Sequence, residues 1–143
     1  MTQEDKNLLF HDLCTRLPYG IKVWNEGNVF NIDYISSYGE IHLDIDDDYT
    51  IDVSEVKPCL FPISSMTEEQ KEEYNQSRLK DLHMLNSVLT ERINDENNFD
   101  SLVVAYNEID WLNKNHFDYR GLIENNLAID ATGLNIYRYH PSN

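Results

Sequence analysis

The sequence has few cysteines and few apolar runs. Its two cysteines, Cys14 and Cys59, are too few for a disulfide scaffold, and the lack of a CxxC pair excludes a zinc framework of that type. We expect both to be reduced thiols in the core. No apolar stretch approaches the roughly 18 residues that a membrane span needs. The start, MTQEDKNLLF, lacks a basic region followed by an apolar one. The sequence therefore predicts a cytoplasmic protein without a membrane partner.

Basic residues are also scarce. Only 11 Lys and Arg oppose 26 Asp and Glu, which gives a formal net charge of −15. A negative field of this size repels nucleic-acid phosphates, so direct binding to DNA or RNA is not expected. The imbalance is concentrated, because no Lys or Arg occurs between Lys22 and Lys57.

The acidic segment between those two lysines offers a candidate binding surface. One interpretation is a solvated face that promotes solubility. The other is a surface that docks a basic protein or imitates a nucleic-acid backbone. The candidate residues of this acidic surface are Asp44, Asp46, Asp47, Asp48 and Asp52.

The length of 143 residues, with 41% hydrophobic and 26% charged residues, fits a single globular domain, 1–143. Thr2 and Asp5 form a capping-box pattern, and leucines recur every fourth residue behind it, which predicts a short amphipathic helix over 3–16. Four stretches of period-two alternation then predict an antiparallel meander. The apolar positions of these strands begin at Ile21, Phe30, Ile41 and Tyr49.

Short, strongly twisted strands tend to curl so that they hide their apolar side. An SH3-like, partly open β-barrel is therefore the expected architecture, and a flat sheet covered by helices is the alternative. Pro58 and Pro62 predict a stiff connector after the meander. The fold class is α+β, with the N-terminal helix and meander in 1–63 and a helical hairpin and irregular tail in 64–143.

The helical hairpin is predicted from two amphipathic segments. Thr67 and Gln70 form a second capping-box pattern, which starts the longest helix, about 68–93. After the polar run 94–98, apolar periodicity resumes up to Asn115. The tail from His116 is expected to form one helical turn near 120–126 and an irregular or extended end.

The stretch DIDDDYTIDVSE, 44–55, places acidic residues at several ligand positions of an EF-hand loop. Tyr49 stands where that loop needs glycine, and Pro58 blocks an exiting helix. The same residues form a hairpin around the tip 46–48, which is the preferred interpretation. No metal site is predicted.

Other candidate residues are aromatic or cationic. His116, Tyr119 and Arg120, together with Trp111, form a mixed polar and aromatic cluster in which Arg120 could clamp a carboxylate or phosphate. The alternative is a helix-terminating corner where Arg120 pairs with a local acid. Trp24 lies on the polar side of its strand, either covered by a helix or exposed as an anchor. No GxGxxG, GxSxG or HExxH pattern occurs, so no catalytic residue or cofactor is predicted.

Three phrases, LPYGIKV, KPCLFPISSMTEEQ and NHFDYRGLI, resemble the signature of a family of small proteins carried by phages and integrated mobile elements of gut anaerobes. That family brings no established activity, cofactor or catalytic residue. The resemblance implies an accessory function in a mobile element, such as interference with a host factor or a defence system.

Together these observations predict a non-enzymatic binding protein that presents an acidic or aromatic surface to a host protein. The alternative function is sequestration of a small nucleotide-like signal through Arg120, Trp111 and Tyr119. A small hydrolase-type enzyme is a third hypothesis, which requires an ordered cluster of His, Asp or Cys from separate segments.

Overall fold

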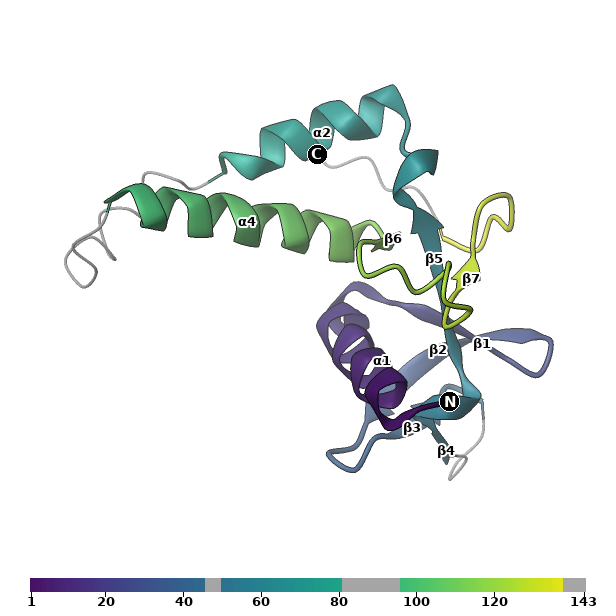
Figure 1. Cartoon of the computed structure of the whole chain (residues 1–143). Coiled ribbons are helices and arrows are strands. Elements are labelled where there is room, and N and C mark those ends of the chain that lie inside the picture. Colours follow the sequence, from purple (N-terminus) through teal and green to yellow (C-terminus); the bar gives the residue numbers. More distant parts are fainter. Residues whose placement is uncertain (46–49, 81–95, 138–143) are drawn as a thin grey trace. The chain divides into compact units, whose positions relative to one another are not determined.

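The computed structural model describes residues 1–45, 50–80 and 96–137 (Figure 1). The chain divides into two compact units. The sheet unit consists of Met1–Ser65 together with the chain from His116 onward, and the helical unit is Met66–Asn115. Helices and strands are both present, which confirms the α+β class.

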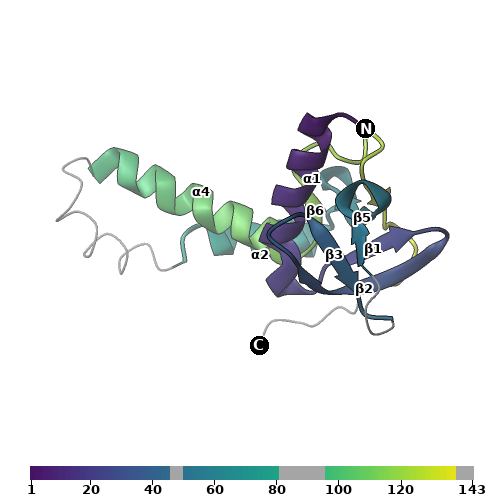
Figure 2. The same cartoon turned by 90° about the horizontal axis from the view of Figure 1, so that it is seen from below.

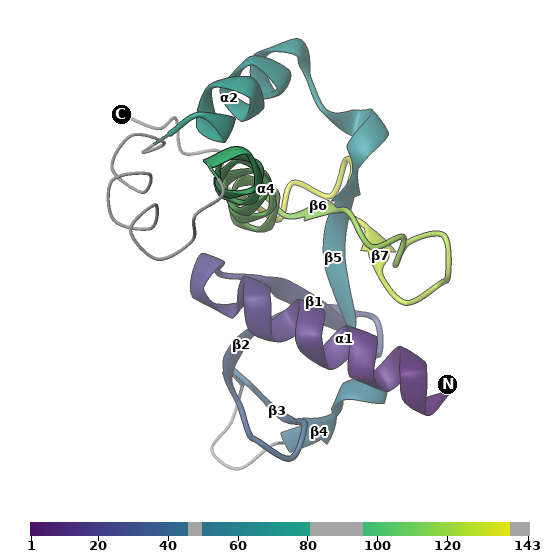
Figure 3. The ribbon, with the colours of Figure 1, turned by 60° about the vertical axis from the view of Figure 1, so that its left-hand side comes forward.

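The first helix, α1 (Gln3–Arg16), has the predicted bounds. The amide of Asp5 donates to Thr2 Oγ1 (3.1 Å), and the amide of Thr2 donates to the Asp5 carboxylate (3.5 Å), which closes the predicted capping box. Leu9 and Leu13 on its inner face are fully buried in the core against the sheet. The helix therefore covers the apolar face of the strands (Figure 3).

The predicted meander is confirmed. Its four strands pair in sequence order, each antiparallel to the next: β1 (Lys22–Asn25), β2 (Asn28–Ile35), β3 (Glu40–Leu43) and β4 (Thr50–Asp52). The pairing of β3 with β4 gives the predicted hairpin rather than an EF-hand loop followed by a helix. Its tip, with Asp46, Asp47 and Asp48, lies outside the described residues.

The predicted stiff connector is wrong, because it is a strand, β5 (Lys57–Pro62). It pairs with β1 through Lys57, and the amide of Phe61 donates to the carbonyl of His116 (2.8 Å). Pro58 stands opposite Val23 of β1, and Pro62 stands opposite Asp118 of β6. Proline lacks only the N–H group, so a strand can contain it wherever that residue does not have to donate to the ladder.

Two short strands from the tail flank β5 in parallel: β6 (Phe117–Asp118) and β7 (Ile129–Asp130). The strand order is β4-β3-β2-β1-β5-β6, with β7 on β5, so the sheet is mixed, mostly antiparallel and open (Figure 2). The expected barrel closure is absent from the described residues. The physical reason is that α1 already buries the apolar side of the sheet, so the strands gain nothing by curling onto themselves.

In its described residues, 66–80 and 96–115, the helical unit forms two antiparallel helices, α2 (Glu68–Arg78) and α4 (Glu96–Lys114), as expected for a hairpin. Thr67 caps α2 as predicted. The rings of Tyr74 and Trp111 pack edge to face, with 5.5 Å between their centroids. Arg78 Nε donates to Glu108 Oε1 (2.8 Å).

The second helix is shorter than the sequence predicts, because α2 ends at Arg78 instead of extending through 93. The Asn107 side-chain amide donates to the carbonyls of Arg78 (3.0 Å) and Lys80 (2.8 Å). It thereby satisfies acceptors that a helix end leaves open. Residues 81–95 lie outside the described part of the chain.

Candidate functional site

Three of the predicted site residues, His116, Tyr119 and Arg120, lie around β6 in the sheet unit. The Asp118 carboxylate organises the turn that follows this strand, because it accepts hydrogen bonds from the amides of Arg120 (3.1 Å), Leu122 (3.1 Å) and Ile123 (3.0 Å). A short side chain that caps several amides fixes the local backbone. These bonds fix the backbone from which the Arg120 side chain extends.

The Arg120 side chain forms an ion pair with a carboxylate of the N-terminal helix α1. Its Nε donates to Asp12 Oδ1 (3.1 Å), and Arg16 Nε donates to Asp12 Oδ2 (3.0 Å). Arg16 Nη2 also donates to the carbonyl of Phe117 (2.8 Å). We call Asp12, Arg16, Tyr119 and Arg120 the Asp12 cluster. It joins α1 to the segment after β6, so Arg120 pairs with a distant acid rather than a local one.

The Asp12 cluster is largely closed to solvent. The side chains of Asp12 and Arg16 are 0% exposed, and that of Arg120 is 25% exposed. Burial raises the pKa of Asp12 above its ordinary value, and the neighbouring guanidinium groups oppose that shift. The Tyr119 ring lies 5.1 Å from the guanidinium carbon of Arg16 and 5.0 Å from that of Arg120. These distances fit cation–π contacts on a shared ring.

His116 is buried beside this cluster. Its backbone has a positive φ of 64°, and its ring stacks on that of Tyr137 at 3.8 Å. Burial lowers the pKa of His116 to about 4, so the imidazole is neutral near pH 7. The Tyr137 hydroxyl accepts from the amide of Lys22 (2.9 Å) and donates to the carbonyl of Cys59 (2.7 Å). This arrangement makes His116 part of the packing between tail and sheet.

The two tryptophans lie elsewhere. Trp111 is in α4 of the helical unit and is 8% exposed. Its predicted grouping with Tyr119 and Arg120 stays a prediction. Trp24 is half-buried on β1, opposite Val29 of β2.

The acidic surface predicted from the sequence lies on the meander. Asp44 and Asp52 are exposed, as are Asp33 on β2 and Glu40 on β3. Register places Glu40 directly opposite Asp52, on the face of the sheet that points away from buried Ile41 and Ile51. Like charges in directly opposite positions destabilise a sheet.

Aromatic rings accompany these carboxylates. Tyr34 is 49% exposed and stacks on His42 (4.6 Å), whose Nδ1 lies 3.3 Å from Asp33 Oδ2. Tyr38, in the turn between β2 and β3, is 90% exposed. We define the meander face by its exposed acids and tyrosines: Asp33, Tyr34, Tyr38, Glu40, Asp44 and Asp52.

The cysteines show no sign of nucleophilic activation. Cys59 is buried as expected, and burial raises the pKa of its thiol to about 11. Cys14 is exposed on α1, which corrects the expected core position. Within the described ranges, no group of three His, Cys, Asp or Glu side chains could hold a metal ion. None of the helices in those ranges is long and apolar enough to cross a membrane.

Sequence reasoning missed Asp12 and Arg16, although a signal was present. These residues stand three and seven positions after Leu9, so they share the buried face of α1 with Leu9 and Leu13. Charged residues on the apolar face of a helix require partners from elsewhere in the fold. That pattern would have indicated a buried ion pair without revealing that Arg120 completes it.

Comparison of the chain with protein-family models, curated proteins and solved structures finds no match.

Proposed function

We propose that the protein is a non-enzymatic binding protein whose meander face docks a basic segment of another protein. The observation that carries this proposal is the coexistence of exposed carboxylates and exposed tyrosines on one small sheet. Among the described residues, no Lys, Arg or His side chain forms an ion pair with Glu40 or Asp44. Tyr34 and Tyr38 add apolar area beside these charges.

The two components have different roles in such an interface. Carboxylates steer a cationic partner and set the orientation of binding. Tyrosine side chains are enriched at interface centres, where their rings bury area and their hydroxyls keep a polar contact. The absence of Lys and Arg between Lys22 and Lys57 leaves the negative field of this segment uncompensated in the sequence.

The resemblance to proteins of phages and mobile elements suggests the kind of partner. An accessory protein of such an element acts on the host, so we propose a host protein or a component of a defence system. Its binding surface should be basic, in accordance with the charge of the meander face.

The test is capture of host proteins on the immobilised full chain. A face variant carries Asp33→Asn, Glu40→Gln and Asp44→Asn. A control variant removes the same number of charges from exposed positions elsewhere, with Glu69→Gln, Glu72→Gln and Glu124→Gln. We expect one basic protein to bind the parent and the control, to be lost from the face variant, and to elute as salt increases. Equal retention by the two variants would contradict the proposal.

The Asp12 cluster supports a second candidate function, sequestration of a nucleotide-like anion. Two guanidinium groups flank one aromatic ring there, which is the chemistry that binds a phosphate and stacks a base. Arg120 Nε is already committed to Asp12, so an anion would compete with that carboxylate. A thermal-shift screen with cyclic and linear nucleotides tests this function. Stabilisation by a compound at micromolar concentration, lost in Arg120→Gln, would favour it over the docking proposal.

A further inference from the structure

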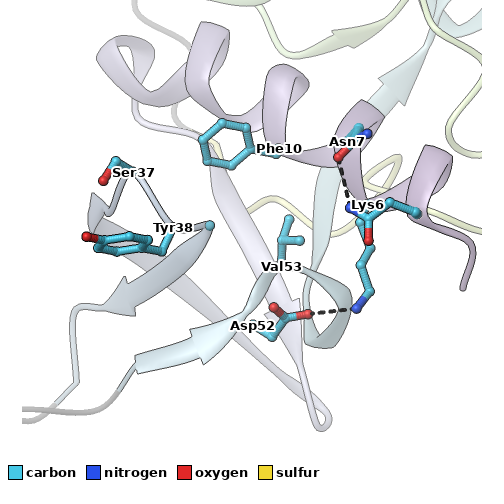
Figure 4. Close-up of a pocket in the computed structure, with 9 residues that line it drawn as sticks. Lys6, Asn7, Phe10, Ser37, Tyr38, Asp52 and Val53 are labelled. Atoms are coloured by element: carbon cyan, nitrogen blue, oxygen red, sulfur yellow. Dashed lines mark hydrogen bonds and ion pairs between the residues drawn. The ribbon is translucent and has the colours of Figure 1, made fainter.

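A groove of about 400 Å³ lies in the sheet unit between α1, the β2–β3 turn and the end of β4 (Figure 4). The helix contributes side chains at four positions of one face, and the sheet contributes the turn and the end of β4. Its lining includes Lys6, Phe10, Tyr38 and Asp52. The groove adjoins the meander face, since Tyr38 and Asp52 belong to both.

Asp52 is held in place and charged. Its Oδ2 accepts hydrogen bonds from the amide (3.0 Å) and the hydroxyl of Ser54, and these bonds lower the pKa of Asp52 below its usual value. Lys6 Nζ lies 3.7 Å from the same oxygen, and the two side chains are 37% and 50% exposed. An exposed ion pair at this distance contributes little free energy, so another cation can replace the lysine.

The charge around the groove favours a cation over an anion. Asp52 lines the groove and pairs with Lys6, and the exposed Glu40 stands directly opposite Asp52 in the register of β3 and β4. A second cation would relieve the repulsion between these acids. A free anion would be repelled by Asp52 and by the neighbouring charge of Glu40.

The aromatic residues specify the shape of that cation. Tyr38 is 90% exposed, and its ring stands at the entrance of the groove opposite α1 (Figure 4). Phe10 is half-buried and provides an apolar wall. A planar guanidinium can stack on a tyrosine ring while donating to a carboxylate, whereas the compact, strongly hydrated ammonium of lysine stacks less well.

We infer that this groove binds an arginine side chain of the basic segment that docks on the meander face. The guanidinium donates to Asp52 and stacks on Tyr38, and the aliphatic stem of the arginine packs against Phe10. This inference rests on the proposed function and adds to it the residue that the partner must present. In the free protein Lys6 pairs with Asp52, and the arginine of the partner displaces it.

An NMR titration of the isotope-labelled full chain tests the inference with three pentapeptides: Gly-Gly-Arg-Gly-Gly, the same peptide with lysine, and the same peptide with neutral citrulline. We expect the arginine peptide to bind most tightly and to shift the amide signals of Lys6, Tyr38 and Asp52. Tyr38→Ala should weaken binding about threefold, and Asp52→Asn about tenfold. The control Glu124→Gln removes an equal charge at an exposed site outside the groove and should change affinity less than about twofold.

Equal affinity for the arginine and citrulline peptides would overturn the inference, as would equal effects of Asp52→Asn and Glu124→Gln. The capture experiment separates its failure from that of the proposed function. If the basic protein still depends on Asp33, Glu40 and Asp44 while the arginine peptide does not bind, the groove assignment is wrong and the docking function stands. If the parent captures no basic protein but binds the arginine peptide at the groove, the docking function is wrong.

Discussion

The Asp12 cluster and the meander face use the same ingredients, carboxylates beside aromatic rings, with opposite consequences. In the cluster, Asp12 is fully buried and each of its oxygens accepts from an arginine. On the face, Glu40 and Asp44 are exposed without an ion-pair partner among the described residues. The comparison teaches that burial and pairing make charge structural, whereas exposure and like-charge neighbours leave it available for a partner.

The largest expected effect comes from breaking the buried pair. Asp12→Ala leaves Arg16 buried without its carboxylate, and removal of one partner of a buried ion pair costs about 3–5 kcal/mol. Urea unfolding should show this loss in the free energy of unfolding. Glu4→Ala, on the exposed side of the same helix, is the control and should cost less than about 1 kcal/mol. A loss as small for Asp12→Ala would mean that the cluster carries no buried charge.

The next effect is a pH dependence beside the cluster. The pKa of His116 is about 4 in the folded protein and about 6.5 when unfolded. The unfolded chain therefore binds the proton more readily. Above pH 6.5 His116 is neutral in both states and does not lower the free energy of unfolding. As the pH decreases towards 4, the free energy of unfolding falls by at most about 3 kcal/mol.

This pH dependence can be isolated with His116→Asn, since asparagine tolerates the positive φ at this position. The difference in the free energy of unfolding between parent and variant should decrease between pH 7.5 and pH 5. His11→Gln, at an exposed position on α1, is the matched control. A pH-independent difference for His116→Asn would show that the imidazole is solvated.

A smaller effect should come from the hydroxyl that links the tail to the sheet. Tyr137→Phe removes the hydrogen bonds to Lys22 and Cys59 while keeping the ring that stacks on His116. The two main-chain groups then lack a partner, which costs about 1–3 kcal/mol. Thermal unfolding should show a lower midpoint, and Tyr34→Phe on the meander face should not.

The smallest effect should have the opposite sign. Glu40→Gln removes the like charge opposite Asp52 and should stabilise the protein by about 0.5 kcal/mol at low salt. The gain should diminish as salt screens the repulsion. Thermal unfolding at two salt concentrations measures it, with Glu124→Gln as the control. A destabilised Glu40→Gln variant would mean that the meander face is not strained by its charge.

Local signals in the sequence predicted local structure well. The capping boxes at Thr2 and Thr67 predicted the starts of α1 and α2, because each motif satisfies backbone groups within one turn. Period-two alternation gave the meander, because each strand pairs with its neighbour in sequence.

The contacts that join distant segments could not be predicted in the same way. Pro58 and Pro62 predicted a connector. The segment is instead a strand, because it pairs with β6 and β7, which come much later in the sequence. The hydrogen bond from Arg120 to Asp12 joins residues 108 positions apart, so no local pattern selects that partner. The sequence predicted the acidic residues of the meander face. The exposure of Tyr34 and Tyr38 beside them could be found only from the structure.

The position of β5 has a consequence for biosynthesis. Its parallel partners β6 and β7 are translated only after the whole helical unit, Met66–Asn115. At ribosomal elongation rates this interval is on the order of several seconds. During that time β5 lacks the strands that pair with Cys59 and Phe61, and Arg16 lacks the carbonyl of Phe117. The sheet unit therefore completes its folding only after the residues that follow Asn115 have been synthesised.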